Sequence, residues 1–295
     1  MRFSFVSAGV AVLVLSASPL FALSPAQAAK GSCDGKLGVS RTVQIDTTSG
    51  PGFGFQHYKQ YDFLQPGEVV LTFDDGPLRG RTERILKALA DQCTKATFFS
   101  VGKQAVAYPE ILKEVAAAGH TIANHTWSHK NLASRKSAKD NNKIAIDEIE
   151  RGISAVHHAV GGRAASFFRY PYLKDSPSTL KYLAKRNIAI FSTDIDSFDF
   201  KRGSAAALIH RVMKNLKRRG KGIILFHDIQ RHTAKALPVI LKKLKAGGYR
   251  IVHLTAKDPV KTLPEYDNKI KPMFKGRDNM AAGRPMSSVI KTISQ

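Results

Sequence analysis

Two adjacent carboxylates, Asp74 and Asp75, stand in the sequence Thr-Phe-Asp-Asp-Gly-Pro. Neighbouring side chains at the end of a strand point in different directions, so the two aspartates can take different roles. One can hold a metal ion while the other takes a proton from water. A capped turn, in which an aspartate accepts backbone N–H bonds before Gly-Pro, is the alternative explanation of this sequence alone.

Two histidines four residues apart, His125 and His129, form a second candidate group. On a helical turn both imidazoles would lie on one face and could bind one divalent ion. Unrelated surface histidines can have the same spacing. The metal-binding interpretation is favoured because the Asp-Asp sequence precedes the pair in the chain. One aspartate with two histidines leaves coordination positions open for water and substrate, as a catalytic metal site requires. Trp127, between the histidines, could line a sugar site or pack in the core.

Three later segments place further polar groups in loops. Arg169 begins the sequence Arg-Tyr-Pro-Tyr and could pair with a carboxylate, fixing its orientation and charge. Residues 196–200, Asp-Ser-Phe-Asp-Phe, form an acidic and aromatic loop. An apolar run then leads to His227, the better candidate for a general acid. His253 is a weaker rival, because no other site-like residue accompanies it.

From residue 68 onward, short apolar runs alternate with stretches of helical period. Strands separated by helices of this length indicate β-α units and a parallel sheet. The expected strands are 69–73, 96–101, 121–123, 166–168, 188–191, 222–226 and 250–253. The expected helices are 81–91, 109–118, 142–159, 177–186, 204–218 and 233–246.

The candidate residues fall at corresponding points of this pattern, namely the C-terminal ends of strands. In a parallel barrel these ends open on one face, where sites are built. Seven strands favour a closed or nearly closed barrel over an open doubly wound sheet, although periodicity alone does not settle that choice. The ends are occupied by Asp74 and Asp75 (first strand), His125 (third), Arg169 (fourth), Asp194 and Asp196 (fifth) and His227 (sixth).

In this order, the five segments resemble the signature motifs of the polysaccharide deacetylases, also called the NodB-homology family or carbohydrate esterase family 4. The resemblance covers residues 67–255. It implies a distorted (β/α)7-type barrel with parallel strands, the NodB-homology fold. It also implies an enzyme that hydrolyses N- or O-acetyl groups of sugars with one divalent metal ion. The metal is usually zinc in that family, with cobalt, nickel or manganese as other candidates.

The resemblance also implies individual roles. Phe200 stands where the family often has tryptophan, which keeps an aromatic wall but leaves its contacts with substrate open. By the resemblance, Asp75, His125 and His129 bind the metal, Asp74 is the catalytic base and His227 is the general acid. Arg169 would orient Asp74, and Asp199 would tune His227. The backbone N–H of Tyr172 would bind the oxyanion, and Leu225 would contact the acetyl methyl group.

The N-terminus has the order of a secretory signal peptide. Arg2 precedes an apolar run and small residues that end in Ala-Gln-Ala at Ala28. We expect cleavage there and an exported protein, periplasmic or secreted; an uncleaved membrane anchor is the alternative. No later segment is apolar and long enough to span a bilayer. The mature chain would then consist of an irregular arm (29–66), the catalytic domain (67–255) and a basic tail (256–295).

Two cysteines remain after cleavage, Cys33 in the arm and Cys93 in the domain. In an oxidising compartment they could form one disulfide that ties the arm to the domain. Two unpaired thiols are the alternative.

The charge is strongly positive, with 46 Lys and Arg against 23 Asp and Glu. Residues 201–250 hold fourteen of the cations and a single acid, Asp228. Such a field attracts polyanions, and an exported protein meets anionic envelope polymers first. A solvated face that only keeps the protein soluble is the alternative.

Other classes of function fit less well. A nucleic-acid binder is supported by charge alone, lacks a recognisable motif, and conflicts with export. A glycosidase needs carboxylates on opposite sides of the bond, which adjacent Asp74 and Asp75 cannot easily provide. A carbohydrate-binding homologue without activity would not need every catalytic position filled. Peptidoglycan, chitin-like oligosaccharides, another N-acetylhexosamine polymer and O-acetylated xylan are all compatible substrates, with peptidoglycan favoured. The oligomeric state is open.

Overall fold

The computed structural model describes Met1, residues 33–136 and residues 139–274. It consists of two units, Met1–Asp34 and Gly35–Gln295, and nearly all described residues belong to the second. The predicted signal peptide, apart from Met1, and residues 275–295 of the predicted tail lie outside the described residues. Within the described ranges, no helix is apolar and long enough to cross a membrane.

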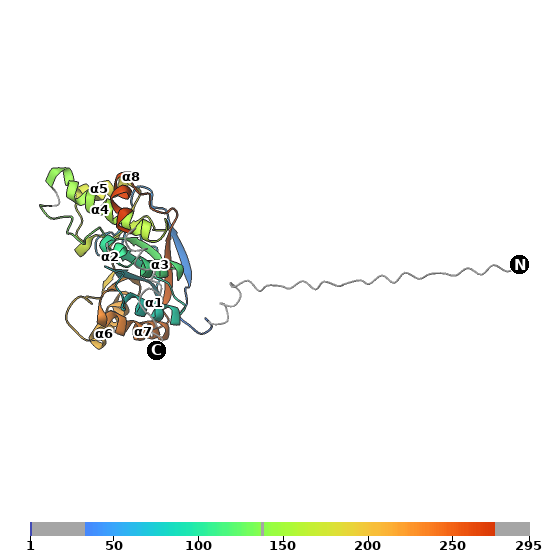
Figure 1. Cartoon of the computed structure of the whole chain (residues 1–295). Coiled ribbons are helices and arrows are strands. Elements are labelled where there is room, and N and C mark those ends of the chain that lie inside the picture. Colours follow the sequence, from blue (N-terminus) through green and yellow to red (C-terminus); the bar gives the residue numbers. More distant parts are fainter. Residues whose placement is uncertain (2–32, 137–138, 275–295) are drawn as a thin grey trace, which may run out of the picture. The chain divides into compact units, whose positions relative to one another are not determined.

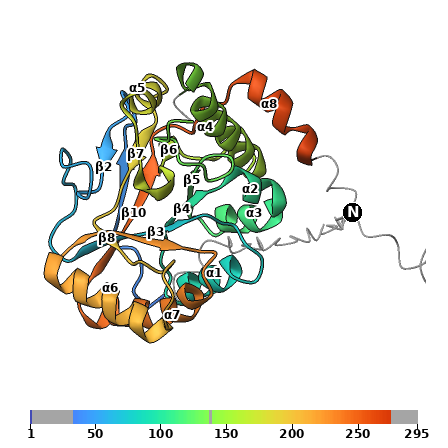
Figure 2. The same cartoon turned by 90° about the vertical axis from the view of Figure 1, so that its left-hand side faces the viewer.

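The described part of the chain contains one sheet of ten strands. Figures 1 and 2 show the strands in the interior of the second unit, with helices around them. The strands are β1 (Arg41–Ile45), β2 (Gly52–Phe53), β3 (Glu68–Asp74), β4 (Thr97–Ser100), β5 (Thr121–Asn124), β6 (Phe167–Phe168), β7 (Ala189–Phe191), β8 (Ile195–Asp196), β9 (Gly222–His227) and β10 (Arg250–Ala256).

Eight of these strands pair in the order β8-β9-β3-β4-β5-β6-β7-β2, and every pairing is parallel. The remaining two extend from the start of β3, where β10 pairs with Glu68 and Val69 and β1 pairs with β10. All seven strands predicted from the sequence are present, and the parallel α/β fold is confirmed. The parallel pairing places the C-terminal ends of β3, β5, β6 and β9 at one edge.

The centre of the sheet is apolar on both faces, as expected for a parallel strand covered by helices. Every residue of β3 is buried. Phe73 stacks between Phe98 of β4 and Phe226 of β9, with ring centroids 5.1 and 5.5 Å apart. This packing fixes the strands whose ends carry Asp74 and His227.

Helices connect most of the strands. All six predicted helices are present, while α2 and α8 were not predicted. The helices are α1 (Thr82–Asp91), α2 (Gly102–Ala107), α3 (Pro109–Ala117), α4 (Lys139–Ala159), α5 (Pro177–Lys185), α6 (Ala205–Arg219), α7 (Arg231–Ala246) and α8 (Pro264–Ile270), with a 3-10 turn at Pro171–Leu173.

Helix α6 shows why the periodic segments were predictable. Ser204 caps its N-terminus by accepting a hydrogen bond from the Ala207 N–H, and Gly220 ends it in the left-handed conformation. Its buried residues, Leu208, Val212 and Leu216, recur every four positions and face the sheet.

The arm predicted to be irregular instead contributes two strands. Residues 41–45 form β1, whose Thr42 lies opposite His253 of β10, and residues 52–53 form β2 beside β7. Arg41 is anchored by Glu68 through bonds of 2.8 and 2.7 Å. The strands are short, and their partners are far away in the sequence, so local periodicity does not reveal them.

Asp194 lies between β7 and β8 in the chain and links the arm, after β2, to β9. One of its carboxylate oxygens accepts a hydrogen bond from the Phe55 N–H, and the other accepts from the Ile223 N–H, both at 2.7 Å. The Arg219 guanidinium lies 3.6 Å away. Asp194 therefore joins the arm to β9 and has a structural role.

The beginning of the predicted tail is also ordered. Tyr266 and Ile270 of α8 are buried, and Asp267 accepts hydrogen bonds from the Ser154 hydroxyl and His158 of α4. Residues 264–270 thus pack on α4. Neither cysteine is a free thiol in the structure, and the pairing of Cys33 with Cys93 stays a prediction.

Candidate active site

A cavity of about 410 Å³ opens at the C-terminal edge of the parallel strands. Its walls contain most of the polar residues that the sequence singled out. The lining residues are Gln56, Asp74, Asp75, His125, His129, Tyr170, Tyr172, Leu173, Asp196, Phe200, Leu225 and His227.

Three of the lining residues form a group that could hold a metal ion. The ligand atoms of Asp75, His125 and His129 all lie within 4.8 Å of one another. Asp75 Oδ1 is 3.4 Å from His125 Nε2 and 3.2 Å from His129 Nε2. This oxygen is buried and accepts no hydrogen bond. An orphaned carboxylate oxygen between two imidazole nitrogens fits a divalent cation, which would leave further coordination positions open.

The charge states of this group suit a cation. Burial acts to raise the pKa of Asp75, but the close contact with His125 and the charges of His125, His227 and His129 lower it to about 2. Burial and the charge of His125 lower the pKa of His129. Near neutral pH the site therefore offers an ionised carboxylate and a neutral imidazole, the forms that bind metals.

The helical turn expected for residues 125–129 is wrong. Thr126 and His129 both have left-handed backbones, with φ of 66° and 58°, so the segment is a loop. Buried Glu148 of α4 holds this loop, because its backbone carbonyl accepts from the Trp127 N–H and its carboxylate accepts from Ser128. Anchoring by α4, and not helical periodicity, brings the two imidazoles together.

A hydrogen bond from Nδ1 fixes the orientation of the His125 ring. Its Nδ1 lies 2.7 Å from the backbone carbonyl oxygen of Arg169, so the proton sits on Nδ1 and Nε2 faces Asp75. Such a contact behind a ligating histidine fixes both the tautomer and the orientation of the ring.

Asp74 is held by Arg169, which is completely buried. One guanidinium nitrogen donates to Asp74 Oδ1 at 2.8 Å and to the Thr72 hydroxyl at 2.7 Å. The other terminal nitrogen donates to the Ser192 carbonyl at 2.8 Å, and the guanidinium stacks 4.2 Å from the centre of the Phe99 ring. The second oxygen of Asp74 is left for the cavity, 4.0 Å from His125 Nε2.

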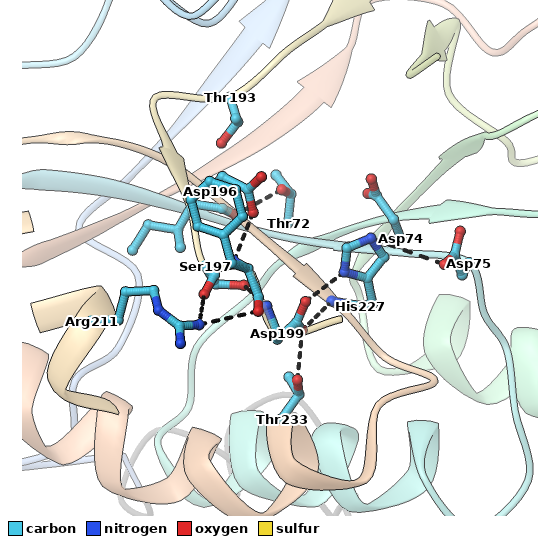
Figure 3. A network of polar contacts seen from close by, with 12 residues as sticks. Thr72, Asp74, Asp75, Thr193, Asp196, Ser197, Asp199, Arg211, His227 and Thr233 are labelled. Atoms are coloured by element: carbon cyan, nitrogen blue, oxygen red, sulfur yellow. Dashed lines mark hydrogen bonds and ion pairs between the residues drawn. The ribbon is translucent and has the colours of Figure 1, made fainter. Parts of the chain in front are cut away.

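His227 is paired with Asp199 (Figure 3). Its Nδ1 lies 2.6 Å from Asp199 Oδ1. Burial acts to lower the pKa of His227, but the hydrogen bond and charge of Asp199, together with the charges of Asp74 and Asp75, raise it to about 9. The imidazole is therefore protonated near neutral pH and can act as an acid.

The apolar wall contains three of the four predicted substrate-contacting residues. Leu225 lines the cavity beside His227, and Phe200 and Tyr172 are 53 and 61% exposed at its rim. The Phe200 ring packs edge-on to His227 at 5.8 Å. Trp127 does not line the cavity: it is 7% exposed, and Arg151 of α4 stacks 4.4 Å from its ring centre. Of the two roles that the sequence left open for Trp127, the structure supports packing in the core.

His253, the rival acid, also lies away from the cavity and contacts the Thr121 hydroxyl instead. Sequence reasoning missed two contributors. Gln56 reaches the cavity from the arm. Asp228 follows His227 and is fully buried, with its carboxylate accepting from the Thr82 hydroxyl at 2.7 Å. A Cβ at Gly76 would come within 2.0 Å of that carboxylate, so the loop after Asp75 packs directly on Asp228.

Comparison with known proteins agrees with this site. Residues 64–190 match the polysaccharide deacetylase family model. A peptidoglycan-N-acetylglucosamine deacetylase of Bacillus cereus is 34% identical over 216 residues, which are 71% of this chain and 76% of that protein. A chitooligosaccharide deacetylase of Azorhizobium caulinodans is 32% identical over 54% of this chain and 73% of its own length.

A solved structure shows the same likeness. The peptidoglycan deacetylase Bd3279 of Bdellovibrio bacteriovorus superposes with a TM-score of 0.66 at 34% identity, covering 77% of this chain and 62% of that one. With the identity to the Bacillus cereus enzyme, this establishes the family. The chain belongs to the polysaccharide deacetylases.

Proposed function

We propose that this protein removes acetyl groups from N-acetylhexosamine units of a cell-envelope glycan, with a divalent cation held by Asp75, His125 and His129. One observation carries the proposal: the metal-binding group, an arginine-bound carboxylate and a carboxylate-bound histidine open into the same cavity. One carboxylate and two histidines favour zinc, although the same donors also accept cobalt, nickel or manganese.

Each residue has a chemical task in this proposal. The cation, when bound, polarises the acetyl carbonyl and lowers the pKa of water. Asp74, oriented by Arg169, takes the proton of the attacking water. His227 donates its Nε2 proton to the departing amine, which would otherwise be a poor leaving group. The Tyr172 N–H is proposed to stabilise the oxyanion, and Leu225 to border the acetyl methyl.

Peptidoglycan is our first choice of substrate. Relatives from Bacillus cereus and Bacillus subtilis are named for peptidoglycan deacetylation, and those from rhizobia for chitooligosaccharides. We further propose that the chain is exported after cleavage near Ala28, which places it where an envelope polymer is found.

A groove that carries three lysines supports an anionic polymer as partner. The groove lies on α6 and α7 and has a volume of about 600 Å³. It is lined by Lys214, Lys217 and Lys243 and also by apolar side chains, among them Ile209, Met213 and Val239. In the described residues none of these lysines forms a salt bridge, whereas Arg219 on the same helix is paired with Asp194. No carboxylate of the described residues pairs with these three lysines, so their positive field can act on a partner.

The test is an acetate-release assay on peptidoglycan, chitin oligosaccharides and acetylated xylan, with and without a chelator. We expect release from N-acetylated glycans that a chelator abolishes and zinc restores. Release from xylan alone would instead indicate an O-acetyl esterase. Glycan binding without release from any substrate would indicate a silent carbohydrate-binding homologue and would refute the proposal.

A further inference from the structure

We infer that the N-terminal arm is part of the substrate-binding site and that the Gln56 side-chain amide hydrogen-bonds the glycan. This inference rests on the proposed function, because it takes the cavity ligand to be a sugar chain. It adds a specificity-determining residue from a segment outside the domain expected from the sequence.

The arm is attached firmly to the segment that follows β7. Phe53 of β2 lies opposite Phe191, and the two rings stack at 5.2 Å. The Gln56 backbone N–H then donates to the Thr193 carbonyl at 3.0 Å, and His57 Nδ1 lies 2.6 Å from the Ser192 hydroxyl. These contacts fix the backbone of residues 53–57 at the edge of the cavity.

Gly54 makes this close approach sterically feasible. Its φ is +99°, a conformation that residues with a side chain rarely adopt. A Cβ there would lie 2.7 Å from the backbone of both Ser192 and Thr193. The turn that presents Gln56 therefore requires glycine, and any larger residue at position 54 would displace it.

The position and the chemistry of the Gln56 side chain suit contact with a sugar. It lines the cavity and is exposed, and no hydrogen bond from its amide occurs among the described residues. The amide offers both donors and an acceptor, which suits the hydroxyl and acetamido groups of a glycan. Metal-binding and proton-transfer roles occupy the other charged groups, except Asp196, whose Oδ1 already accepts a hydrogen bond from the Phe198 N–H. Of the two tyrosines that line the cavity, Tyr170 donates its hydroxyl to Thr179. Gln56 is thus the neutral amide available for recognition, together with the Tyr172 hydroxyl at the rim.

The experiment compares Gln56→Ala with Gln60→Ala, which removes an exposed glutamine of the same arm that does not line the cavity. Two substrates are used, a tetramer of N-acetylglucosamine and 4-nitrophenyl acetate, which has no sugar. For Gln56→Ala, kcat/KM on the tetramer should fall about 3- to 10-fold, mainly through KM, as expected for one neutral hydrogen bond. The fall on the ester should be smaller, and Gln60→Ala should match the parent protein on both.

Equal tetramer kinetics for Gln56→Ala and Gln60→Ala would overturn the inference, as would equal losses on both substrates, which indicate a general structural effect. Failure of the proposed function is distinguishable, because the parent protein would then release no acetate from the tetramer. In that case tetramer affinity is measured by calorimetry, where Gln56→Ala should raise Kd about 3- to 10-fold and an unchanged Kd refutes the inference.

Discussion

His227 and Asp199 are joined twice. The ring Nδ1 of His227 lies 2.6 Å from one oxygen of the Asp199 carboxylate, and the backbone N–H of His227 donates to the other oxygen at 2.7 Å. The Thr233 hydroxyl of α7 donates to that second oxygen at 2.6 Å, and Arg211 of α6 holds the carbonyls of the loop before Asp199 (Figure 3). The carboxylate therefore sets both the tilt of the imidazole and its affinity for a proton.

Replacing Asp199 by Asn should lower the pKa of His227, because the hydrogen bond to a charged acceptor and its favourable charge are both lost. His227 acts protonated, so activity disappears as pH rises through its pKa. The basic limb of the pH profile of kcat/KM should therefore move to lower pH. Asp91→Asn, at an exposed position of α1, should leave the limb in place. An unmoved limb in Asp199→Asn would mean that another group is the acid.

Replacing Asp74 by Asn should leave the metal bound and remove the base. Asp74 is held by Arg169 and lies outside the three-residue metal group. We expect kcat to fall about 100-fold or more, as for loss of a general base. Metal content by mass spectrometry decides the assignment, since a collapse of metal affinity would show that Asp74, and not Asp75, is the ligand.

Replacing His129 by Ala should strip the metal and abolish activity while the fold remains, because two donors hold a divalent ion much more weakly than three. His210→Ala removes an exposed histidine of α6 and serves as control. Metal stoichiometry and circular dichroism are measured together. Full activity in the His129→Ala protein would refute its assignment as a ligand.

The lysines of the α6–α7 groove give a test of polymer capture. Reversing Lys214, Lys217 and Lys243 to Glu should weaken activity on an anionic polymer and leave activity on a neutral chito-oligosaccharide nearly unchanged. Added salt should act in the same way on the parent protein, because screening affects the long-range field and not the chemistry in the cavity. Equal salt sensitivity on the two substrates would show that this charge serves only solubility.

Much of the site could be predicted because its residues follow strands that local pattern identifies. Asp74 and His227 end buried strands of six or seven residues, and their positions at one edge follow from parallel pairing. The neighbours that orient them are harder to see. Thr233 holds Asp199 behind His227, and Glu148 holds the loop that carries His125 and His129. Both lie on helices, at positions whose side-chain direction depends on how each helix packs.

The features that the sequence missed or left open have a common physical origin, since they concern contacts between segments distant in the sequence. Gln56 reaches the cavity only because the arm pairs with β7, more than 130 residues later. Trp127 is close to both histidines in sequence, yet the left-handed backbone at Thr126 turns its ring toward α4. Neither hydrophobic period nor residue type records such long-range geometry.

The pairing of β1 with β10 has a consequence for how the molecule is made. Arg41 lies opposite Val252, 211 residues later, so β1 finds its partner only after the chain has been synthesised through β10. Contacts of such sequence separation slow folding, because a long loop must close before they form. A nascent chain that does not yet include β10 therefore cannot complete this sheet. A fragment trimmed to residues 64–190, the segment that matches the family model, would lack β1, β2, β8, β9 and β10, and with them His227.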